Sequence, residues 1–129
     1  MAKRIAVIND DTTFLELMST LLSDEGYEAH IFRESKSAYQ GARDLGPDAI
    51  ILDIRMESPA TGWQMLELFK LDPVLARVPI IICSADISAL QERAVHLQSK
   101  GCELLPKPFD LDDLLNALRR LVGRPDGEA

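Results

Sequence analysis

Basic residues are in the minority in this chain of 129 residues, where 14 lysines and arginines stand against 21 aspartates and glutamates. The resulting formal net charge of -7 argues against direct binding of nucleic acid, whose phosphates attract a basic face. No apolar stretch approaches the roughly 20 residues that a helix needs to span a bilayer, and the first residues lack the pattern of a signal peptide. We therefore expect a cytoplasmic protein that contacts neither nucleic acid nor membrane.

Cysteine and histidine are equally scarce, with two residues of each kind. Cys83 and Cys102 are too few to make a disulfide framework in a chain of this length. Apolar neighbours flank both, so we expect buried and reduced thiols. His30 and His96 have no metal-ligand partner at useful spacing, which favours surface or partly packed positions for both.

Apolar residues make up 47% of the chain, enough for one sizeable core. Continuous apolar runs over 5–8, 49–52 and 80–83 are typical of strands that are covered on both faces. The segment 27–32 alternates between apolar and polar residues, as an edge strand does, and 104–105 is a short fifth strand.

Apolar residues at helical spacing follow each strand, and Ser35 and Asp110 are candidate helix caps. Residues 57–61 read as a loop. The expected helices lie over about 14–22, 35–45, 62–71, 87–97 and 111–122.

Strands that alternate with helices imply parallel strands joined by right-handed crossovers. We predict an α/β fold with a single five-stranded parallel sheet, a doubly wound (βα)5 arrangement in the flavodoxin-like strand order 2-1-3-4-5. One domain is expected over 1–123, and 124–129 read as a tail or linker.

Polar residues gather where the predicted strands end, and in open α/β sheets this edge carries the site. Carboxylates that converge there need a cation, and oxygen ligands with room for water suit Mg²⁺. A carboxylate nucleophile, Mg²⁺, a lysine and a hydroxyl together fit phosphoryl transfer. The residues in question are Asn9, Asp10, Asp11, Asp53, Ser84 and Lys107.

Four motifs, in order along the chain, resemble those of bacterial response-regulator receiver domains, the CheY-like family of two-component signalling. The resemblance covers about residues 4–122. The motifs are 5–11 (IAVINDD), 47–56 (PDAIILDIRM), 79–85 (PIIICSA) and 107–109 (KPF).

The resemblance implies a role for each matching residue. Asp53 would accept a phosphoryl group from the phosphohistidine of a sensor histidine kinase or phosphotransfer protein. Asp10, Asp53 and the backbone carbonyl of Arg55 would ligate Mg²⁺. Ser84 would donate to a phosphoryl oxygen and Lys107 would pair with Asp53. Such a domain switches a downstream protein, whose identity the sequence leaves open together with a homodimer, and it is not a turnover enzyme.

Three departures from the family pattern bear on the switch. Asn9 replaces an acid, so it would hold the metal through a water and leave the Mg²⁺ affinity weaker. Arg55 has the reach to pair with Asp86 and gate water access to the acyl phosphate. The aromatic switch position in the fifth strand is a leucine, either Leu104 or Leu105.

Other readings remain open at this point. Asp10 and Asp11 can be a helix-capping pair, and Asp53 can be an ordinary loop residue. The departures favour a receiver-fold interaction module that acts without phosphorylation. The intact residues of the site count against that module; they are Asp10, Asp53, Ser84 and Lys107. A carboxylate-nucleophile phosphohydrolase on a similar α/β sheet is disfavoured. Such enzymes usually place a second acid two residues after the nucleophile, and this chain has Arg55 there.

Overall fold

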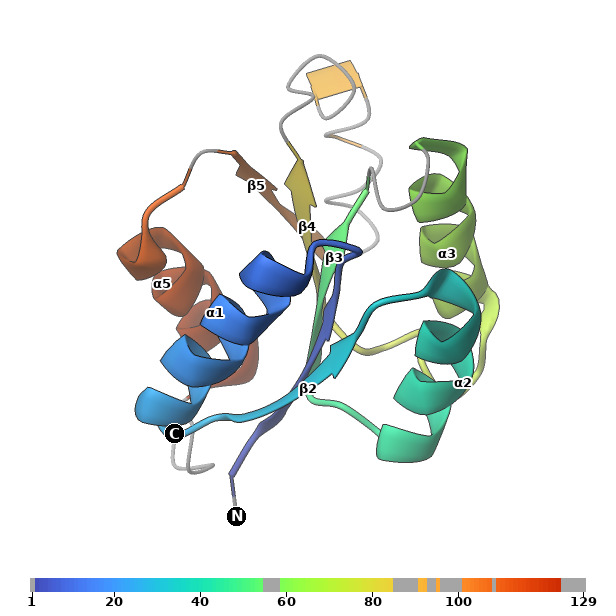
Figure 1. The fold of residues 1–129 in the computed structure, drawn as a ribbon. Coiled ribbons are helices and arrows are strands. Elements are labelled where there is room, and N and C mark those ends of the chain that lie inside the picture. Colours follow the sequence, from blue (N-terminus) through green and yellow to red (C-terminus); the bar gives the residue numbers. More distant parts are fainter. Residues whose placement is uncertain are drawn as a thin grey trace.

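The computed structural model describes residues 2–54, 59–84, 91, 92, 95, 101–107 and 109–123, and for 59 and 60 the backbone alone. Five parallel strands form one sheet in the order β2-β1-β3-β4-β5, with helices against both of its faces (Figure 1). This is the predicted flavodoxin-like, doubly wound arrangement.

The strands lie where the apolar runs predicted them. They are β1 (Arg4–Ile8), β2 (Glu28–Phe32), β3 (Ala49–Asp53), β4 (Ile80–Ser84) and β5 (Cys102–Pro106). The central strands β1, β3 and β4 are almost fully buried, whereas β2 exposes two of its five residues, as expected for an edge. The predicted alternation along β2 is wrong, because Ile31 is exposed and Phe32 packs against the core. The fifth strand is longer than predicted.

The described helices pack in two pairs. Figure 1 shows α1 (Thr12–Asp24) and α5 (Leu111–Val122) on one face of the sheet, and α2 (Ser35–Leu45) and α3 (Pro59–Leu71) on the other. Most of the predicted helix over 87–97 lies outside the described residues. Within that range residues 91, 92 and 95 are described, and all three are helical.

Two helix starts differ from the prediction. The cap of α2 is Glu34, whose backbone is extended (φ -126°, ψ 142°), so Ser35 is the first helical residue and not the cap. The expected loop over 57–61 ends early, because α3 begins at Pro59, and the fixed φ of proline suits the first helical position. Asp110 does precede α5, and its N–H donates to Asp113 Oδ2 at 3.3 Å.

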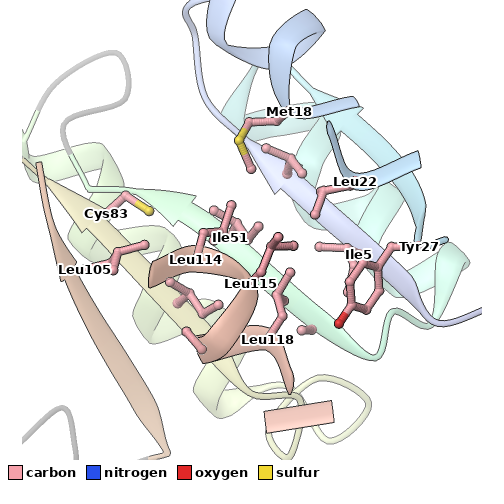
Figure 2. Packing of buried hydrophobic residues seen from close by; sticks show 14 of the residues in the cluster. Ile5, Met18, Leu22, Tyr27, Ile51, Cys83, Leu105, Leu114, Leu115 and Leu118 are labelled. Atoms are coloured by element: carbon pink, nitrogen blue, oxygen red, sulfur yellow. The ribbon is translucent and has the colours of Figure 1, made fainter. Parts of the chain in front are cut away.

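The core has one layer on each face of the sheet. Figure 2 shows the layer between the sheet and the α1–α5 pair, where Leu22, Ile51, Leu114 and other apolar side chains interlock. Cys83 belongs to this layer, whereas Cys102 belongs to the layer under α2 and α3. Both cysteines are buried and neither forms a disulfide, as predicted, and burial raises the pKa of Cys83 to about 12.

Further side chains pack as expected. Trp63 lies against the layer under α2 and α3, and Phe109 lies against the opposite layer. His30 pairs on the surface with Glu28, at 2.8 Å between Nε2 and Oε2. His96 lies outside the described residues.

A buried carboxylate, Asp72, ties the end of α3 to α2. Its Oδ2 accepts a hydrogen bond from the Tyr39 hydroxyl and lies 2.8 Å from Nε of Arg43, and its Oδ1 accepts from the Val74 N–H at 2.7 Å. The hydrogen bond from Tyr39 is the main cause that holds the pKa of Asp72 below its usual range. From the sequence, Asp72 is only the residue that follows the expected helix over 62–71.

Replacing Asp72 with asparagine should destabilise the fold at neutral pH, because Tyr39 and Arg43 lose a charged partner. A lowered folded-state pKa means that the charge contributes stability above the unfolded pKa of about 3.9, and that this contribution is lost as the pH falls through the folded-state pKa. The loss of unfolding free energy that Asp72→Asn causes, measured by urea unfolding, should therefore become smaller as the pH falls. Asp44→Asn, an exposed acid on α2, is the control, and a deficit independent of pH would contradict the assignment.

Gly62 is required by a close approach of α3 to the end of β3. A Cβ at this position would lie 1.7 Å from the backbone oxygen of Ile54, which cannot move aside as a side chain can. Gly62→Ala should lower the free energy of unfolding by about 1 to 3 kcal/mol. Gly41→Ala is the matched comparison, since its Cβ would meet the movable ring of Phe32, and equal losses in urea titrations would refute this explanation.

Candidate functional site

The carboxyl ends of four neighbouring strands bring the predicted site residues to one edge of the sheet. In the register, Ile8 lies beside Leu52 and Leu52 beside Ile82. Asn9 therefore leaves β1 next to the point where Asp53 ends β3. Ser84 ends β4, opposite Pro106, and Lys107 follows β5.

An ion pair joins Asp53 to Lys107. Nζ of the lysine lies 3.1 Å from Oδ2 of the aspartate, and the two side chains are 27% and 12% exposed, respectively. Because both side chains are largely buried, the attraction is screened less than between surface charges. The backbone of Lys107 is held in place as well, since its N–H donates to the carbonyl of Ser84 at 2.8 Å.

The three residues that follow β1, 9–11, have different roles. Oδ1 of the buried Asn9 accepts from the Asp11 N–H at 2.9 Å, which closes the turn after the strand. Asp11 is the cap of α1, and its Oδ1 accepts from the N–H groups of Thr13 and Phe14 at 3.0 and 3.3 Å. The capping alternative thus holds for Asp11, while Asp10 is exposed between the strand and the helix.

The end of β4 is closed over by protein. Ser84 is fully buried, and its neighbour Cys83 lies directly opposite Asp53 in the sheet. The ladder continues past the strands, because the N–H of Ile54 donates to the Cys83 carbonyl at 3.2 Å. The sheet therefore holds the Asp53 and Ser84 backbones at a fixed separation.

The remaining predicted site features fall in two groups. The Arg55 carbonyl and the predicted pairing of Arg55 with Asp86 lie outside the described residues. Leu104 packs toward α3 and Leu105 toward α5, so the two leucines at the aromatic switch position belong to opposite core layers.

The donor set at this edge consists of oxygen atoms. Asp10 and Asp53 supply carboxylates and Asn9 supplies an amide. Within the described ranges, His, Cys, Asp and Glu side chains form no group of three or more that could enclose a metal ion. Few protein ligands, all of them oxygen, fit Mg²⁺, which retains several waters, better than a metal that a full protein cage encloses.

Phe14 belongs to the site although sequence reasoning placed it only in the core. Nζ of Lys107 lies over its ring, 5.0 Å from the ring centroid. The ring also borders an apolar groove of about 570 Å³ between α1 and α5, which Leu17, Leu21 and Leu114 line as well. An aromatic residue in the first turn after the capping Asp11 was the available signal.

A comparison with protein families matches residues 5–119 to the response regulator receiver domain. The chain is 31% identical over 131 residues to the response regulator MprA of Mycolicibacterium vanbaalenii, covering all of this chain and 55% of MprA. It is 26% identical over 128 residues to the DNA-binding response regulator MtrA of Mycobacterium tuberculosis, covering 99% of this chain and 54% of MtrA. The chain thus spans about half the length of these relatives.

Solved structures agree on the fold. Chemotaxis protein CheY4 of Vibrio cholerae superposes with a TM-score of 0.82 at 24% identity, over 94% of this chain and 99% of that one. The receiver domain of sensor histidine kinase PA1611 from Pseudomonas aeruginosa, described with a magnesium ion coordinated in its active-site cleft, gives a TM-score of 0.76 at 24% identity, over 95% and 99% of the two chains.

In the part of the chain that the structure describes, no helix has the length and apolar character needed to cross a membrane. The family match extends over nearly all of the chain, and the sheet order and the placement of polar residues at the strand ends agree with it. The chain belongs to the response regulator receiver domain family of two-component signalling.

Proposed function

We propose that this receiver domain is a working phosphoacceptor switch in which Asp53 takes the phosphoryl group. The observation that supports it most is the ion pair of Lys107 with Asp53, at the edge where Ser84 and the acidic turn after β1 also end. The largely buried Asp53 carboxylate is an acceptor that lies beside the positive charge its transition state requires.

The transfer moves a phosphoryl group between two nucleophiles. A carboxylate oxygen of Asp53 attacks the phosphorus of a phosphohistidine on a sensor histidine kinase or phosphotransfer protein. An oxygen–phosphorus bond forms, the phosphorus–nitrogen bond breaks, and the imidazole nitrogen keeps the electron pair. Lys107 faces the negative charge that spreads over the phosphoryl oxygens. The domain promotes this single event on itself and releases no product in repeated turnovers.

The residues around Asp53 fit a magnesium ion. Asp10, Asp53 and the backbone carbonyl of Arg55 would ligate it, and Asn9 would hold it through a water molecule, although the Arg55 carbonyl lies outside the described residues. When bound, Mg²⁺ neutralises charge on the phosphoryl oxygens and so lowers the barrier to transfer. The relative from Pseudomonas aeruginosa supports this choice of metal.

Ser84 and Lys107 would change their contacts when Asp53 is phosphorylated. Phosphorylation replaces one carboxylate charge by about two on the phosphoryl group and adds strong acceptors. The ammonium of Lys107 then follows the charge to a phosphoryl oxygen, and the buried hydroxyl of Ser84 donates to another. Since both residues share the hydrogen bond from the Lys107 N–H to the Ser84 carbonyl, a shift of one moves the other. Leucines at 104 and 105 leave no aromatic ring to rotate.

Partners follow from this role. A sensor kinase or phosphotransfer protein donates the phosphoryl group in the cytoplasm, and a downstream protein binds the switched face, with a homodimer as one form of output. We assign residues 1–123 to the receiver and 124–129 to a tail. The match to MtrA covers about half of a DNA-binding regulator, and with a net charge of -7 we assign no DNA contact to this chain.

Acetyl phosphate with Mg²⁺ should add one phosphoryl group to the protein, read as intact mass, and none without the metal. Asp53→Ala should abolish the gain, and Lys107→Ala should slow it about 100-fold, because it removes a charged donor from the transition state. Asp44→Asn, an exposed acid elsewhere, should react like the wild type. Absence of any gain in the folded wild-type protein, or a gain in Asp53→Ala, would contradict the proposal.

Asn9→Asp should tighten Mg²⁺ binding about tenfold in titration calorimetry, because it adds a charge beside two other carboxylates. The new carboxylate can still accept from the Asp11 N–H, so the turn is preserved. Thermal unfolding supplies the control, since the variant should be less stable than the wild type without Mg²⁺ and should recover with it. An unchanged affinity would mean that position 9 does not face the metal.

A further inference from the structure

Two contacts converge on the ammonium group of Lys107. Nζ lies 3.1 Å from Oδ2 of Asp53 and 5.0 Å from the centroid of the Phe14 ring, which it covers. The first contact belongs to the proposed phosphoryl-transfer site. The second joins that site to α1, a helix that supplies no residue to the transfer itself.

The position of the Phe14 ring is well defined by the chain around it. Phe14 lies in the first turn of α1, where its N–H donates to the side chain of the capping Asp11 at 3.3 Å. Its side chain is half-buried and packs against the core layer that α1 and α5 share. The turn that carries Asp10 therefore also places the aromatic face beside the lysine.

A ring face attracts an ammonium group without neutralising it. At a partly exposed site, attraction to the negative face of the ring favours the position of the cation over the ring about two- to fivefold. A carboxylate in the same place would cancel the charge that the phosphoryl oxygens need. Lysine also has a flexible four-carbon stem, so without a surface to rest on its ammonium group would leave Asp53 more often.

We propose that Phe14 is a positioning residue for phosphoryl transfer, one that keeps the Lys107 ammonium within reach of Asp53. The inference rests on the proposed function and adds to it a residue outside the matched motifs. The ring keeps its hold when the charge on Asp53 changes, because its attraction for the ammonium does not depend on that carboxylate. Lys107 can then pass from the carboxylate to a phosphoryl oxygen without leaving the site.

Phe14→Leu keeps an apolar side chain in the groove but removes the ring, and Phe14→Tyr restores the ring. With acetyl phosphate and saturating Mg²⁺, Phe14→Leu should be phosphorylated about two- to fivefold more slowly than wild type, and Phe14→Tyr at close to the wild-type rate. Leu17→Ala is the matched control, since Leu17 lies on the same face of α1 one turn further on and is 54% exposed. Equal rates for Phe14→Leu and wild type would overturn the inference.

A double-mutant cycle separates positioning from packing. In a Lys107→Met background the ring has no ammonium to hold, so Phe14→Leu should cause no further slowing. The same slowing in both backgrounds would show that Phe14 acts on the fold of α1 and would overturn the inference. Unfolding midpoints of all variants identify a change that only destabilises the domain.

The NMR shift of the Lys107 ε-methylene protons tests the contact without phosphorylation. Protons above a ring face are shifted upfield, so the shift should be present in wild type and Phe14→Tyr and lost in Phe14→Leu. A wild-type protein that accepts no phosphoryl group would refute the proposed function, and the methylene shift would then decide the positioning alone. A shift that Phe14→Leu leaves unchanged overturns the inference in either case.

Discussion

The ion pair between Asp53 and Lys107 is the interaction around which this domain is arranged. Asp53 ends a strand that is buried on both faces, and Lys107 follows a strand two places away in the sheet, so their meeting requires the whole parallel register from β3 to β5. The hydrogen bond from the Lys107 N–H to the Ser84 carbonyl carries that register past the last ladder pair. The register therefore fixes where the backbones of Asp53, Ser84 and Lys107 lie relative to one another.

The acidic turn after β1 shows how three adjacent residues serve different needs. Asn9 closes the turn and Asp11 caps the helix, while Asp10 between them is exposed. An amide at position 9 serves the turn as well as a carboxylate would, and it brings one negative charge less into a group that already repels itself. The departure from the family pattern at position 9 therefore leaves the turn intact.

Much of the fold was predictable from the sequence, because buried parallel strands leave continuous apolar runs and strand ends leave polar residues at a common edge. The predictions for the cap of α2 and for the start of α3 were wrong. A hydroxyl or a loop-forming residue near a helix start does not show which residue is the last one with an extended backbone. Asp72 and Phe14 escaped notice for a different reason. Their roles depend on partners 33 and 93 positions away, which no local pattern contains.

The two cysteines lie on opposite faces of the sheet, one in each core layer. In alkylation the thiolate attacks the reagent, and burial raises the pKa of the Cys83 thiol to about 12, so little thiolate forms at neutral pH. Alkylation of either residue therefore waits for its own layer to open. The alkylation rate of each cysteine therefore reports how often its own core layer opens. The rate at Cys83, which lies opposite Asp53, reports opening of the sheet at the edge that carries the site.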